Sequence, residues 1–427
     1  MTDSLEFTSR DVLRDRQNER LRETVRYSYE NVPFYRATLD DADVDPDDVE
    51  EVDDLEALPF TTKEDFRAEY PDGLFAVDDV DVRRIHASSG TTGKPKIVAY
   101  TEADLDVWNE VMARSMDAAG IEPNDTVQNA YGYGLFTGGL GFHAGAEELG
   151  ATVIPTSSGN TRRQVELARD LESDALCCTP SYALYVAETA EEMGVDPRDL
   201  PLSTVLYGAE PCTEPMREEI EERLDAVGIE NYGLSELIGP GVAVECREAQ
   251  NGMHVQEDHF YPEVVDPETG EPLPEGEEGE LVLTSLSKEA LPVLRYRTGD
   301  LTALTTDECE CGRITTRMDS VTGRADDLLI VRGINLYPSQ IEAVVLEFDD
   351  VAPHYRIDLY REGSMDRLEV TLELVEGFDG DRERLRERIA DRLRNALSID
   401  PDGLELVAYG ALERTEVGKA RRVYDRR

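Results

Sequence analysis

The chain has 427 residues, of which 40% are hydrophobic, and a formal net charge of −50. This length is enough for two or more domains with a large buried core, and the hydrophobic content excludes a chain that is disordered throughout. The acidic excess excludes nucleic acids and anionic membranes as expected partners, because both would be repelled.

The first predicted element is a helix over residues 11–37, whose apolar residues recur at helical spacing until Pro33 interrupts the pattern. An acidic, proline-containing stretch over residues 40–54 follows and predicts a solvated loop. A short strand is expected over residues 83–86.

Residues 87–96, with the sequence ASSGTTGKPK, combine two hydroxyl pairs, two glycines and two lysines. Glycines allow successive backbone N–H groups to approach an anion closely, while hydroxyls add donors and lysines add positive charge. Lys94 and Lys96 are also two of only five lysines in the chain. The segment predicts a loop that cradles a polyphosphate, although it is not a Walker loop. The alternative is an ordinary Ser/Thr/Gly surface turn.

Between residues 84 and 230, short apolar runs alternate with polar helical patterns. The predicted strands are 127–130, 151–155, 175–178 and 204–207, and the predicted helices include 162–171 and 213–227. This alternation predicts a parallel sheet covered by helices, with ligands bound at the carboxyl ends of the strands. Residues 208–211 follow one such strand.

The sequence becomes rich in turns and strands between residues 260 and 305. Beyond Arg324 the expected order is strand, helix, strand, helix, with helices over 339–348 and 382–397. We therefore predict an α/β fold with two domains. The larger, N-terminal domain spans 1–323 and combines parallel βα units with a β-rich part, and a small, mobile α+β domain spans 324–427.

Four further motifs follow the 87–96 loop in order. They are Tyr232-Gly233-Leu234-Ser235-Glu236, Tyr296-Arg297-Thr298-Gly299-Asp300, Gly323-Arg324-Ala325-Asp326-Asp327 and Arg414-Thr415-Glu416-Val417-Gly418-Lys419. Each is weak alone, but in this order they closely resemble the adenylate-forming superfamily of acyl-CoA synthetases. Residues 129–139, 257–263 and 332–340 narrow the resemblance to the phenylacetate–CoA ligase family.

The resemblance implies an AMP-forming acid–thiol ligase. Such an enzyme uses ATP and Mg²⁺ to convert an aryl carboxylate into an acyl-adenylate and pyrophosphate, and CoA then displaces AMP to give a thioester. The nucleotide-binding residues that it implies are Ser88, Ser89, Gly90, Thr91, Thr92, Gly93, Lys94, Gly208, Ala209, Glu210, Tyr232, Gly233, Ser235, Asp300 and Arg324.

The resemblance also implies individual roles. The loop from Ser88 to Lys96 would bind the β- and γ-phosphates, and Gly208, Ala209 and Glu210 would line the adenine pocket with Tyr232 stacked on the ring. Asp300 would accept hydrogen bonds from the ribose hydroxyls, with Arg324 on the phosphate or ribose. The catalytic residues would be Lys419, Glu236 and Arg324, with Glu236 holding Mg²⁺.

Lys419 would stabilise charge on the α-phosphate and the substrate carboxylate during adenylation. The resemblance implies that its domain rotates between the two half-reactions about a hinge at Asp326. Tyr131 and Phe136 would border the aryl ring of the acid, although aromatic residues also commonly serve only as core. We expect the glycines at 132, 134, 138 and 139 to leave space for this acid pocket.

Cys309 and Cys311 form a Cys-x-Cys pair, and Cys246 and His254 precede it by about sixty residues. Three thiolates and one imidazole form a closed structural zinc site, which the resemblance supports for some members of the family. We therefore predict zinc at these four residues, with His259 as an alternative to His254. The remaining cysteines at 177, 178 and 212 are expected to be small buried residues.

Other readings of the resemblance remain open. The acid could instead be benzoate, a hydroxycinnamate or indoleacetate, the acyl acceptor could be a carrier protein, or the chain could be a non-catalytic binding protein on the same fold. A homodimer is possible. Residues 1–6 lack a basic region and no run of eighteen apolar residues occurs, so we expect a cytoplasmic protein without a membrane span. The acidic excess and the ratio of 38 arginines to 5 lysines also predict a halophilic protein.

Overall fold

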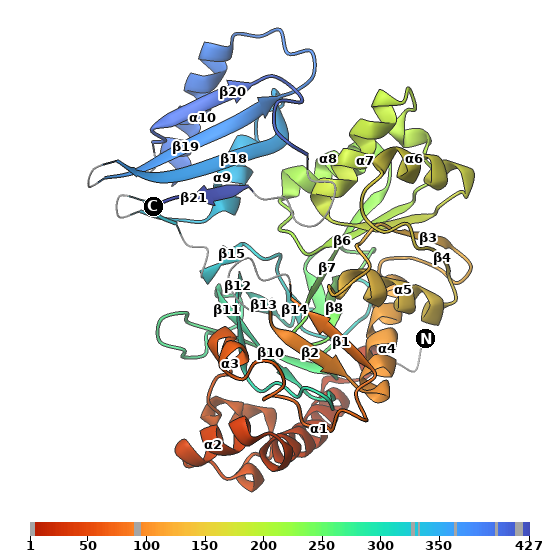
Figure 1. Ribbon diagram of the computed structural model, residues 1–427, viewed down its shortest axis with the longest axis vertical. Coiled ribbons are helices and arrows are strands. Elements are labelled where there is room, and N and C mark those ends of the chain that lie inside the picture. The colour runs from red at the N-terminus through yellow and green to blue at the C-terminus, as the bar shows by residue number, and fades with distance from the viewer. Residues whose placement is uncertain are drawn as a thin grey trace.

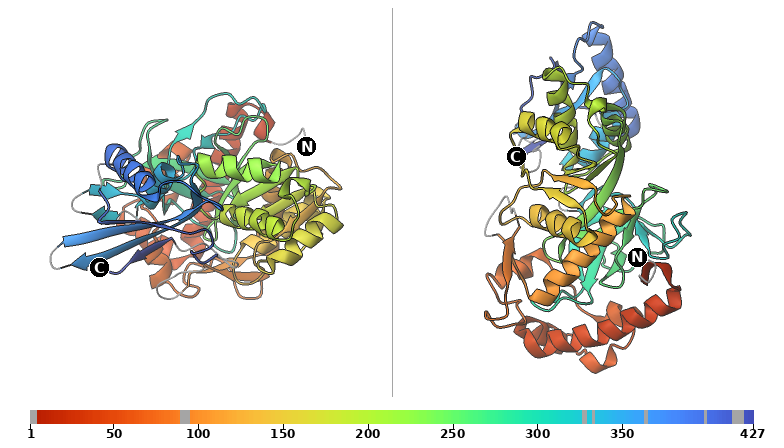
Figure 2. Two further views of the ribbon diagram at one scale, coloured as in Figure 1. Left: turned by 90° about the horizontal axis from the view of Figure 1, so that it is seen from above. Right: turned by 90° about the vertical axis from the view of Figure 1, so that its right-hand side faces the viewer.

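The computed structural model of the chain describes residues 5–88, 95–325, 329–331, 334–362, 365–397, 400–414 and 422–427. The predictions for Ser89 to Lys94, for the hinge at Asp326 and for Lys419 lie outside these ranges. The molecule is elongated, with the first helices at one end and the C-terminal strands at the other (Figures 1 and 2).

The N-terminal region is helical, but it holds two helices where the sequence predicts one. Helix α1 spans Arg10–Asn31 and α2 spans Pro33–Asp41. Pro33 starts the second helix because proline at the first helical position loses no intrahelical hydrogen bond. The acidic stretch that follows contains two 3₁₀ turns and is not simply a loop. The remaining short elements are η1 (Leu5–Phe7), η2 (Pro46–Asp48), η3 (Val52–Ala57) and α3 (Lys63–Ala68).

The predicted phosphate loop lies between the two strands of an antiparallel hairpin. Strand β1 spans Arg84–Ala87, which confirms the strand expected there, and β2 spans Ile97–Tyr100. Ala87 pairs with Ile97, and the Ser88 N–H donates to the Lys96 carbonyl at 3.0 Å. The hairpin therefore fixes both ends of the loop.

The largest sheet has nine strands in the order β13-β14-β9-β8-β7-β6-β5-β3-β4. Its parallel part consists of β3 (Thr126–Asn129), β4 (Thr152–Ile154), β5 (Ala175–Cys178), β6 (Thr204–Gly208) and β7 (Val227–Leu234). Its antiparallel part consists of β8 (Gly239–Glu245), β9 (Met253–Val255), β13 (Leu304–Thr305) and β14 (Arg317–Met318). The predicted parallel strands are confirmed, whereas the change of direction after β7 was not foreseen.

Helices cover both faces of the parallel part, as the alternation of strands and helices predicts. The helices are α4 (Glu102–Ala118), α5 (Gly138–Leu149), α6 (Thr161–Asp170), α7 (Pro180–Glu192), η4 (Pro197–Asp199) and α8 (Glu214–Leu224). Neighbouring residues of one strand enter different cores: Cys177 packs in the cluster that contains α4 and α5, and Cys178 in the cluster that contains α6, α7 and α8. The apolar runs have this composition because both faces are buried.

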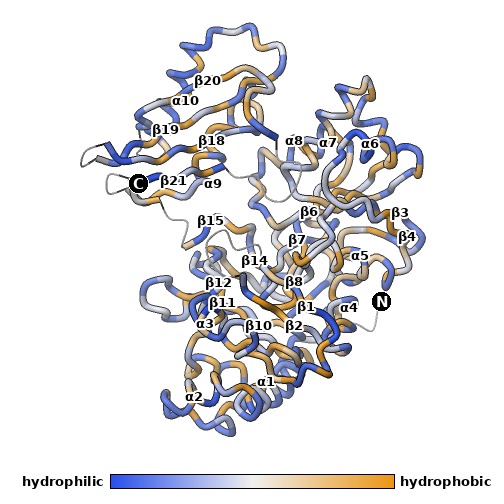
Figure 3. The backbone as a smooth tube through the Cα atoms, in the orientation of Figure 1, coloured by the Kyte–Doolittle hydropathy of each residue, from blue (hydrophilic) through white to orange (hydrophobic). Residues whose placement is uncertain are grey.

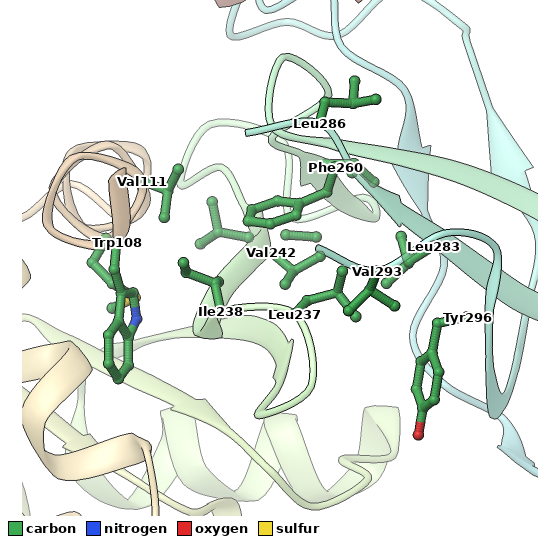
Figure 4. Close-up of a cluster of buried hydrophobic side chains, with 14 of the residues drawn as sticks. Trp108, Val111, Leu237, Ile238, Val242, Phe260, Leu283, Leu286, Val293 and Tyr296 are labelled. Carbon is green, nitrogen blue, oxygen red and sulfur yellow. The ribbon is translucent and has the colours of Figure 1, made fainter. Parts of the chain in front are cut away.

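The turn-rich region forms a second sheet of four antiparallel strands in the order β10-β11-β12-β15. These strands are β10 (Phe260–Val265), β11 (Gly279–Ser285), β12 (Tyr296–Thr302) and β15 (Gly323–Arg324). The main buried cluster joins this sheet to α4 and to the segment after β7. Figure 4 shows Leu237 and Ile238 pointing into that cluster together with Trp108 and Phe260.

The C-terminal part has a hydrophobic cluster of its own, which runs from Leu329 to Leu393. Its elements are β16 (Leu329–Val331), β17 (Ile334–Leu336), α9 (Pro338–Val345), β18 (Val351–Glu362), β19 (Met365–Leu374), α10 (Arg382–Leu397), β20 (Gly403–Val407) and β21 (Val423–Asp425). The two predicted helices are confirmed, and β20-β19-β18-β21 form one sheet. The boundary at 323/324 stays a prediction.

Hydropathy follows this architecture. In Figure 3 hydrophobic residues recur along the central strands and the helices beside them, whereas hydrophilic residues recur along the outer helices and loops. Within the described ranges, none of the helices combines the length and the apolar character that crossing a membrane requires.

Candidate active site

Several predicted site residues lie at the ends of neighbouring strands. Gly208 ends β6, Tyr232 and Gly233 lie near the end of β7, and Glu236 follows in the turn to β8. Asp300 lies on β12 of the second sheet. The carboxyl ends of the parallel strands thus meet the second sheet at one place, which is where such sheets bind ligands.

Glu236 is the centre of a polar cluster formed by three segments. The Lys96 ammonium, just before β2, forms an ion pair with the Glu236 carboxylate. The Tyr296 hydroxyl, from β12, donates to Glu236 Oε1 at 3.1 Å, and Lys96 Nζ lies 3.4 Å from the same hydroxyl. The Glu236 side chain is only 7% exposed, so this ion pair is shielded from solvent.

Among the described residues, Tyr232 and Arg324 each hold one carboxylate oxygen of Asp300. The Tyr232 hydroxyl donates to Oδ2 at 2.7 Å, and Arg324 donates to Oδ1 at 2.9 Å. Asp300 and Arg324 face each other because they are register partners on β12 and β15. Burial, followed by the Asp300 charge, raises the pKa of Tyr232 well above its ordinary value, so the hydroxyl stays a donor. The result is an oriented carboxylate.

The chain after β6 takes an unusual path. Ala209 has a φ of 69°, in the left-handed region, and a Cβ on Gly208 would lie 2.0 Å from the Asn231 carbonyl oxygen. Only glycine therefore permits β6 and β7 to approach so closely at this point. Glu210 turns toward α7, where the Ser181 hydroxyl donates to its carboxylate at 2.6 Å.

Tyr131 is almost completely buried. Its ring stacks on Phe142 with centroids 4.6 Å apart. Its hydroxyl donates to the Cys178 carbonyl at 2.5 Å and lies 3.2 Å from the Gly208 carbonyl oxygen. Tyr131 thereby ties β5 and β6 together at the end where ligands are expected. Phe136 is half-buried.

The glycines near Tyr131 are predicted to leave space for the acid, but not all of them do. A Cβ at Gly138 would lie 2.8 Å from the Phe136 ring, and one at Gly139 would lie 2.6 Å from the Gly132 carbonyl oxygen. These two glycines permit close packing. At Gly134, in contrast, a Cβ would meet nothing within 4 Å, so open space remains there.

The predicted zinc ligands come together. The ligand atoms of Cys246, His254, Cys309 and Cys311 all lie within 4.8 Å of one another. Thr315 lies 3.1 Å from Nδ1 of His254, which leaves Nε2 facing the cluster at 3.4 Å from Cys311 Sγ. Such a partner on the second ring nitrogen is typical of metal-binding histidines.

His259 is not a member of this cluster. Its Nδ1 lies 2.7 Å from the Ser287 hydroxyl, and its Nε2 lies 3.2 Å from Asp258. Burial lowers the pKa of His259 to about 4. Of the two histidines that the sequence leaves open, the structure groups His254 with the cysteines.

Among the described residues, the side chains of Lys96, Tyr296 and Thr137 also contact predicted site residues. Lys96 lies in the predicted phosphate loop, but its pairing with Glu236 could not be read from the sequence. Tyr296 begins the motif that ends at Asp300, but the sequence does not predict its hydrogen bond to Glu236. Thr137, at the start of α5, places its hydroxyl 3.2 Å from that of Ser235. The rarity of lysine in this chain was the one available signal, and it points to Lys96.

Residues 10–287 match the sequence model of AMP-binding enzymes, and residues 333–427 match that of the AMP-binding enzyme C-terminal domain. A phenylacetate-coenzyme A ligase of Thermus thermophilus is 51% identical over 439 residues, covering 99% of this chain and 98% of the relative. The phenylacetate-coenzyme A ligase of Escherichia coli is 48% identical, covering 100% and 97%. The chain belongs to the phenylacetate-coenzyme A ligase family of AMP-binding enzymes.

Solved structures of another ligase, in two states, extend the comparison of this phenylacetate-coenzyme A ligase family member. A 2-hydroxyisobutyryl-CoA ligase in its postadenylation state superimposes with a TM-score of 0.93 at 30% identity, covering 99% of this chain and 91% of that chain. The same ligase in its thioesterification state gives a TM-score of 0.74 at 31% identity, covering 98% and 91%. The adenylate-forming fold predicted from the sequence is confirmed.

Proposed function

We propose that this chain is an AMP-forming ligase that activates phenylacetate, or a close aryl acid, and transfers it to CoA. In the first step the acid carboxylate attacks the α-phosphorus of ATP, which forms the acyl-adenylate and releases pyrophosphate. In the second step the CoA thiol attacks the acyl carbon, which forms the thioester and releases AMP. The observation that carries the proposal is the convergence of Glu236 and Asp300, each with a fixed cationic partner, at one end of the sheet.

The two carboxylates suit different parts of Mg-ATP. Glu236 would hold Mg²⁺, since carboxylate oxygens are the ligands this ion prefers, and the ion would disperse charge on the phosphates. Lys96, now paired with Glu236, would be close enough to reach a phosphate oxygen. Asp300 would accept hydrogen bonds from the ribose hydroxyls, because Tyr232 and Arg324 already fix both of its oxygens in place.

For the other predicted residues we propose the roles that the family resemblance implies. Ser88 to Lys94 would cradle the phosphates, Gly208 to Glu210 would line the adenine site, and Tyr131 and Phe136 would border the acid. Acid-dependent exchange of labelled pyrophosphate into ATP tests the proposal. Exchange with phenylacetate supports it, and exchange with benzoate, a hydroxycinnamate or indoleacetate alone would assign a different acid. No exchange by folded protein with any of these acids would favour a binding protein.

We propose further that Cys246, His254, Cys309 and Cys311 hold a structural zinc ion. Three thiolates and one imidazole fill all four positions of tetrahedral zinc and leave none for a substrate. The ion would connect β8 and β9 to the turn around Cys309, far along the chain. Its contribution would therefore be to stability rather than to the reaction.

Replacing Cys311 with serine tests the zinc site. We expect Cys311→Ser to lose bound zinc and to unfold at a lower temperature, because metal binding contributes directly to folding. Elemental analysis and thermal unfolding give both values. Cys212→Ser, which changes a thiol outside the cluster, should keep the zinc. Wild-type protein without zinc, or zinc retained by Cys311→Ser, would contradict the site.

The C-terminal part would turn between the two steps, with Lys419 entering the site for adenylation and Asp326 as the hinge. A buried ion cluster joins α7 to the C-terminal part in the arrangement that the structure has, which would be one of the two. Glu188 on α7 receives hydrogen bonds from Arg414 at 3.0 Å, and its Oε1 lies 2.9 Å from His354 on β18. Arg414 also bonds Glu373 on β19. Burial disfavours the ionised Glu188, but His354 and Arg414 outweigh it and lower its pKa.

Through these contacts Glu188 would hold the C-terminal part against α7 in the arrangement used for adenylation. We expect Glu188→Ala to slow pyrophosphate exchange about tenfold, since a close interfacial charge pair is worth about 1.5 kcal/mol or more. Thioester formation from supplied acyl-adenylate should be largely spared, as it also should be in Lys419→Ala. Glu191→Ala is the matched control, because Glu191 lies on the same helix but pairs with Arg223 on α8. Equal loss in both half-reactions would contradict this role.

ATP and CoA are intracellular substrates, so we place the enzyme in the cytoplasm. Halophily and a homodimer remain proposals. The first rests on the net charge of −50. The second rests on the family resemblance alone, and a sedimentation measurement would decide it.

A further inference from the structure

Lys288 is a buried cation in contact with the turn that carries Glu236. It follows β11 and is only 5% exposed. Its ammonium donates to the Leu237 carbonyl at 2.5 Å and lies 4.1 Å from the centre of the Tyr100 ring. Leu237 is the residue next to Glu236, so the ammonium acts on the backbone that presents the carboxylate.

Two more side chains hold the same turn. The Tyr100 hydroxyl donates to the Ile238 carbonyl at 2.9 Å, and the Trp108 indole N–H donates to the Pro240 carbonyl at 3.1 Å. The two rings are stacked, with centroids 5.0 Å apart. Figure 4 shows Trp108 beside Ile238 in the buried cluster. Lys288, Tyr100 and Trp108 therefore each donate to one of the carbonyls from 237 to 240, which directly follow Glu236.

Lys288 itself is held rigidly. The carboxylate of Asp104, on α4, accepts from the backbone N–H groups of Glu289 at 2.7 Å and Ala290 at 3.0 Å. These residues directly follow Lys288 in the chain. A fixed backbone on one side and an aromatic face on the other leave the ammonium little freedom, so its hydrogen bond to Leu237 is preorganised.

Such a cation has an energetic cost that packing alone does not explain. Within the part of the chain that the structure describes, no carboxylate forms an ion pair with Lys288, and burial lowers its pKa to about 8, with Asp104 opposing the shift. Buried charges without an ionic partner are rare because desolvation disfavours them. The chain also has 38 arginines and only 5 lysines. Three of the other four lysines are Lys94, Lys96 and Lys419 of the proposed site.

We propose that Lys288 is a positioning residue of the ligase, which fixes the Leu237 carbonyl and thereby aims the Glu236 carboxylate at the Mg²⁺ of Mg-ATP. The inference rests on the proposed role of Glu236. Lys288 would not touch the nucleotide. It would act as an outer-shell partner acts on a metal ligand, by holding the ligand's backbone in one geometry.

The test is the Mg²⁺ dependence of pyrophosphate exchange in Lys288→Met, which keeps an unbranched apolar stem of similar length but removes the ammonium and with it the charge and the donor. We expect half-saturating Mg²⁺ and the KM for ATP to rise about 10- to 100-fold, the usual range for outer-shell partners of a metal ligand. The KM for the aryl acid should change little. Lys288→Arg, which keeps charge and donors, should restore most of the Mg²⁺ response.

Arg217→Met is the matched control for loss of a buried cation. Arg217 pairs with Glu245 at the far end of β8, at 2.8 Å. We expect this variant to unfold at a lower temperature and to keep the wild-type Mg²⁺ response. If Lys288→Met does not fold, Tyr100→Phe provides the test, because it removes only the donor to Ile238 and should shift the Mg²⁺ response in the same direction.

Each outcome decides the inference. A raised Mg²⁺ requirement in Lys288→Met or Tyr100→Phe, absent from Arg217→Met, supports it. A Mg²⁺ response equal to that of the control, whatever the loss of stability, overturns it. Glu236→Gln separates the two proposals. If this variant exchanges pyrophosphate normally, the proposed role of Glu236 is wrong. If Glu236→Gln loses exchange but Lys288→Met and Tyr100→Phe keep the Mg²⁺ response of the control, only the positioning role of Lys288 is wrong.

Discussion

Glu236→Ala should reduce acid-dependent pyrophosphate exchange by about 10²- to 10³-fold, the usual cost of removing one group that stabilises developing charge. The reason is geometric. Lys96 and Tyr296 converge on this carboxylate from two other segments, so the site is built around its charge. Steady-state exchange at saturating ATP and Mg²⁺ measures the effect.

The control for Glu236→Ala is Glu245→Gln. Glu245 is also a buried carboxylate in an ion pair, with Arg217, but it lies at the end of β8 away from the turn. It should lose stability and keep its exchange rate. Comparable losses of exchange in both variants would mean that Glu236 serves the fold, and the assignment to Mg²⁺ would be wrong.

The second large effect concerns salt. At about 10 mM salt the Debye length is about 30 Å, so the acidic residues repel one another across the molecule, whereas at molar salt it falls to about 3 Å. With 93 acidic against 43 basic residues, many carboxylates cannot have a cationic partner. We expect the protein to be unfolded in dilute buffer, and to be folded and to catalyse pyrophosphate exchange in molar KCl.

Circular dichroism and exchange activity, measured between dilute and molar KCl, test this expectation. Choline chloride at equal ionic strength is the control, because screening depends on ionic strength and not on the kind of cation. Full folding and activity in dilute buffer would contradict the halophilic assignment and would leave the ligase assignment intact.

The parallel part of the fold could be predicted because its strands are buried on both faces and read as apolar runs between helical patterns. The change of direction at β7 and β8 could not, because the turn between them contains no glycine or proline pair that marks a hairpin. The break at Pro33 was seen, but proline at a helix start and proline at a helix end look alike in one sequence.

The candidate site was predictable as a set of residue types and not as a set of contacts. The ion pair between Lys96 and Glu236 joins positions 140 residues apart, and spacing along the chain carries no signal for it. The sequence could not decide between His254 and His259 for the same reason. The pairing of β9 with β14, which brings His254 toward Cys311, is a contact between distant parts of the chain.

Formation of the aryl thioester in about molar KCl, followed for phenylacetate with ATP, Mg²⁺ and CoA, decides whether the chain is an adenylate-forming ligase. We expect one AMP and one pyrophosphate for each phenylacetyl-CoA, and pyrophosphate exchange without CoA. Thioester formed with release of ADP and phosphate would contradict the adenylate mechanism, and folded protein that forms no thioester from any aryl acid would contradict the proposed ligase function.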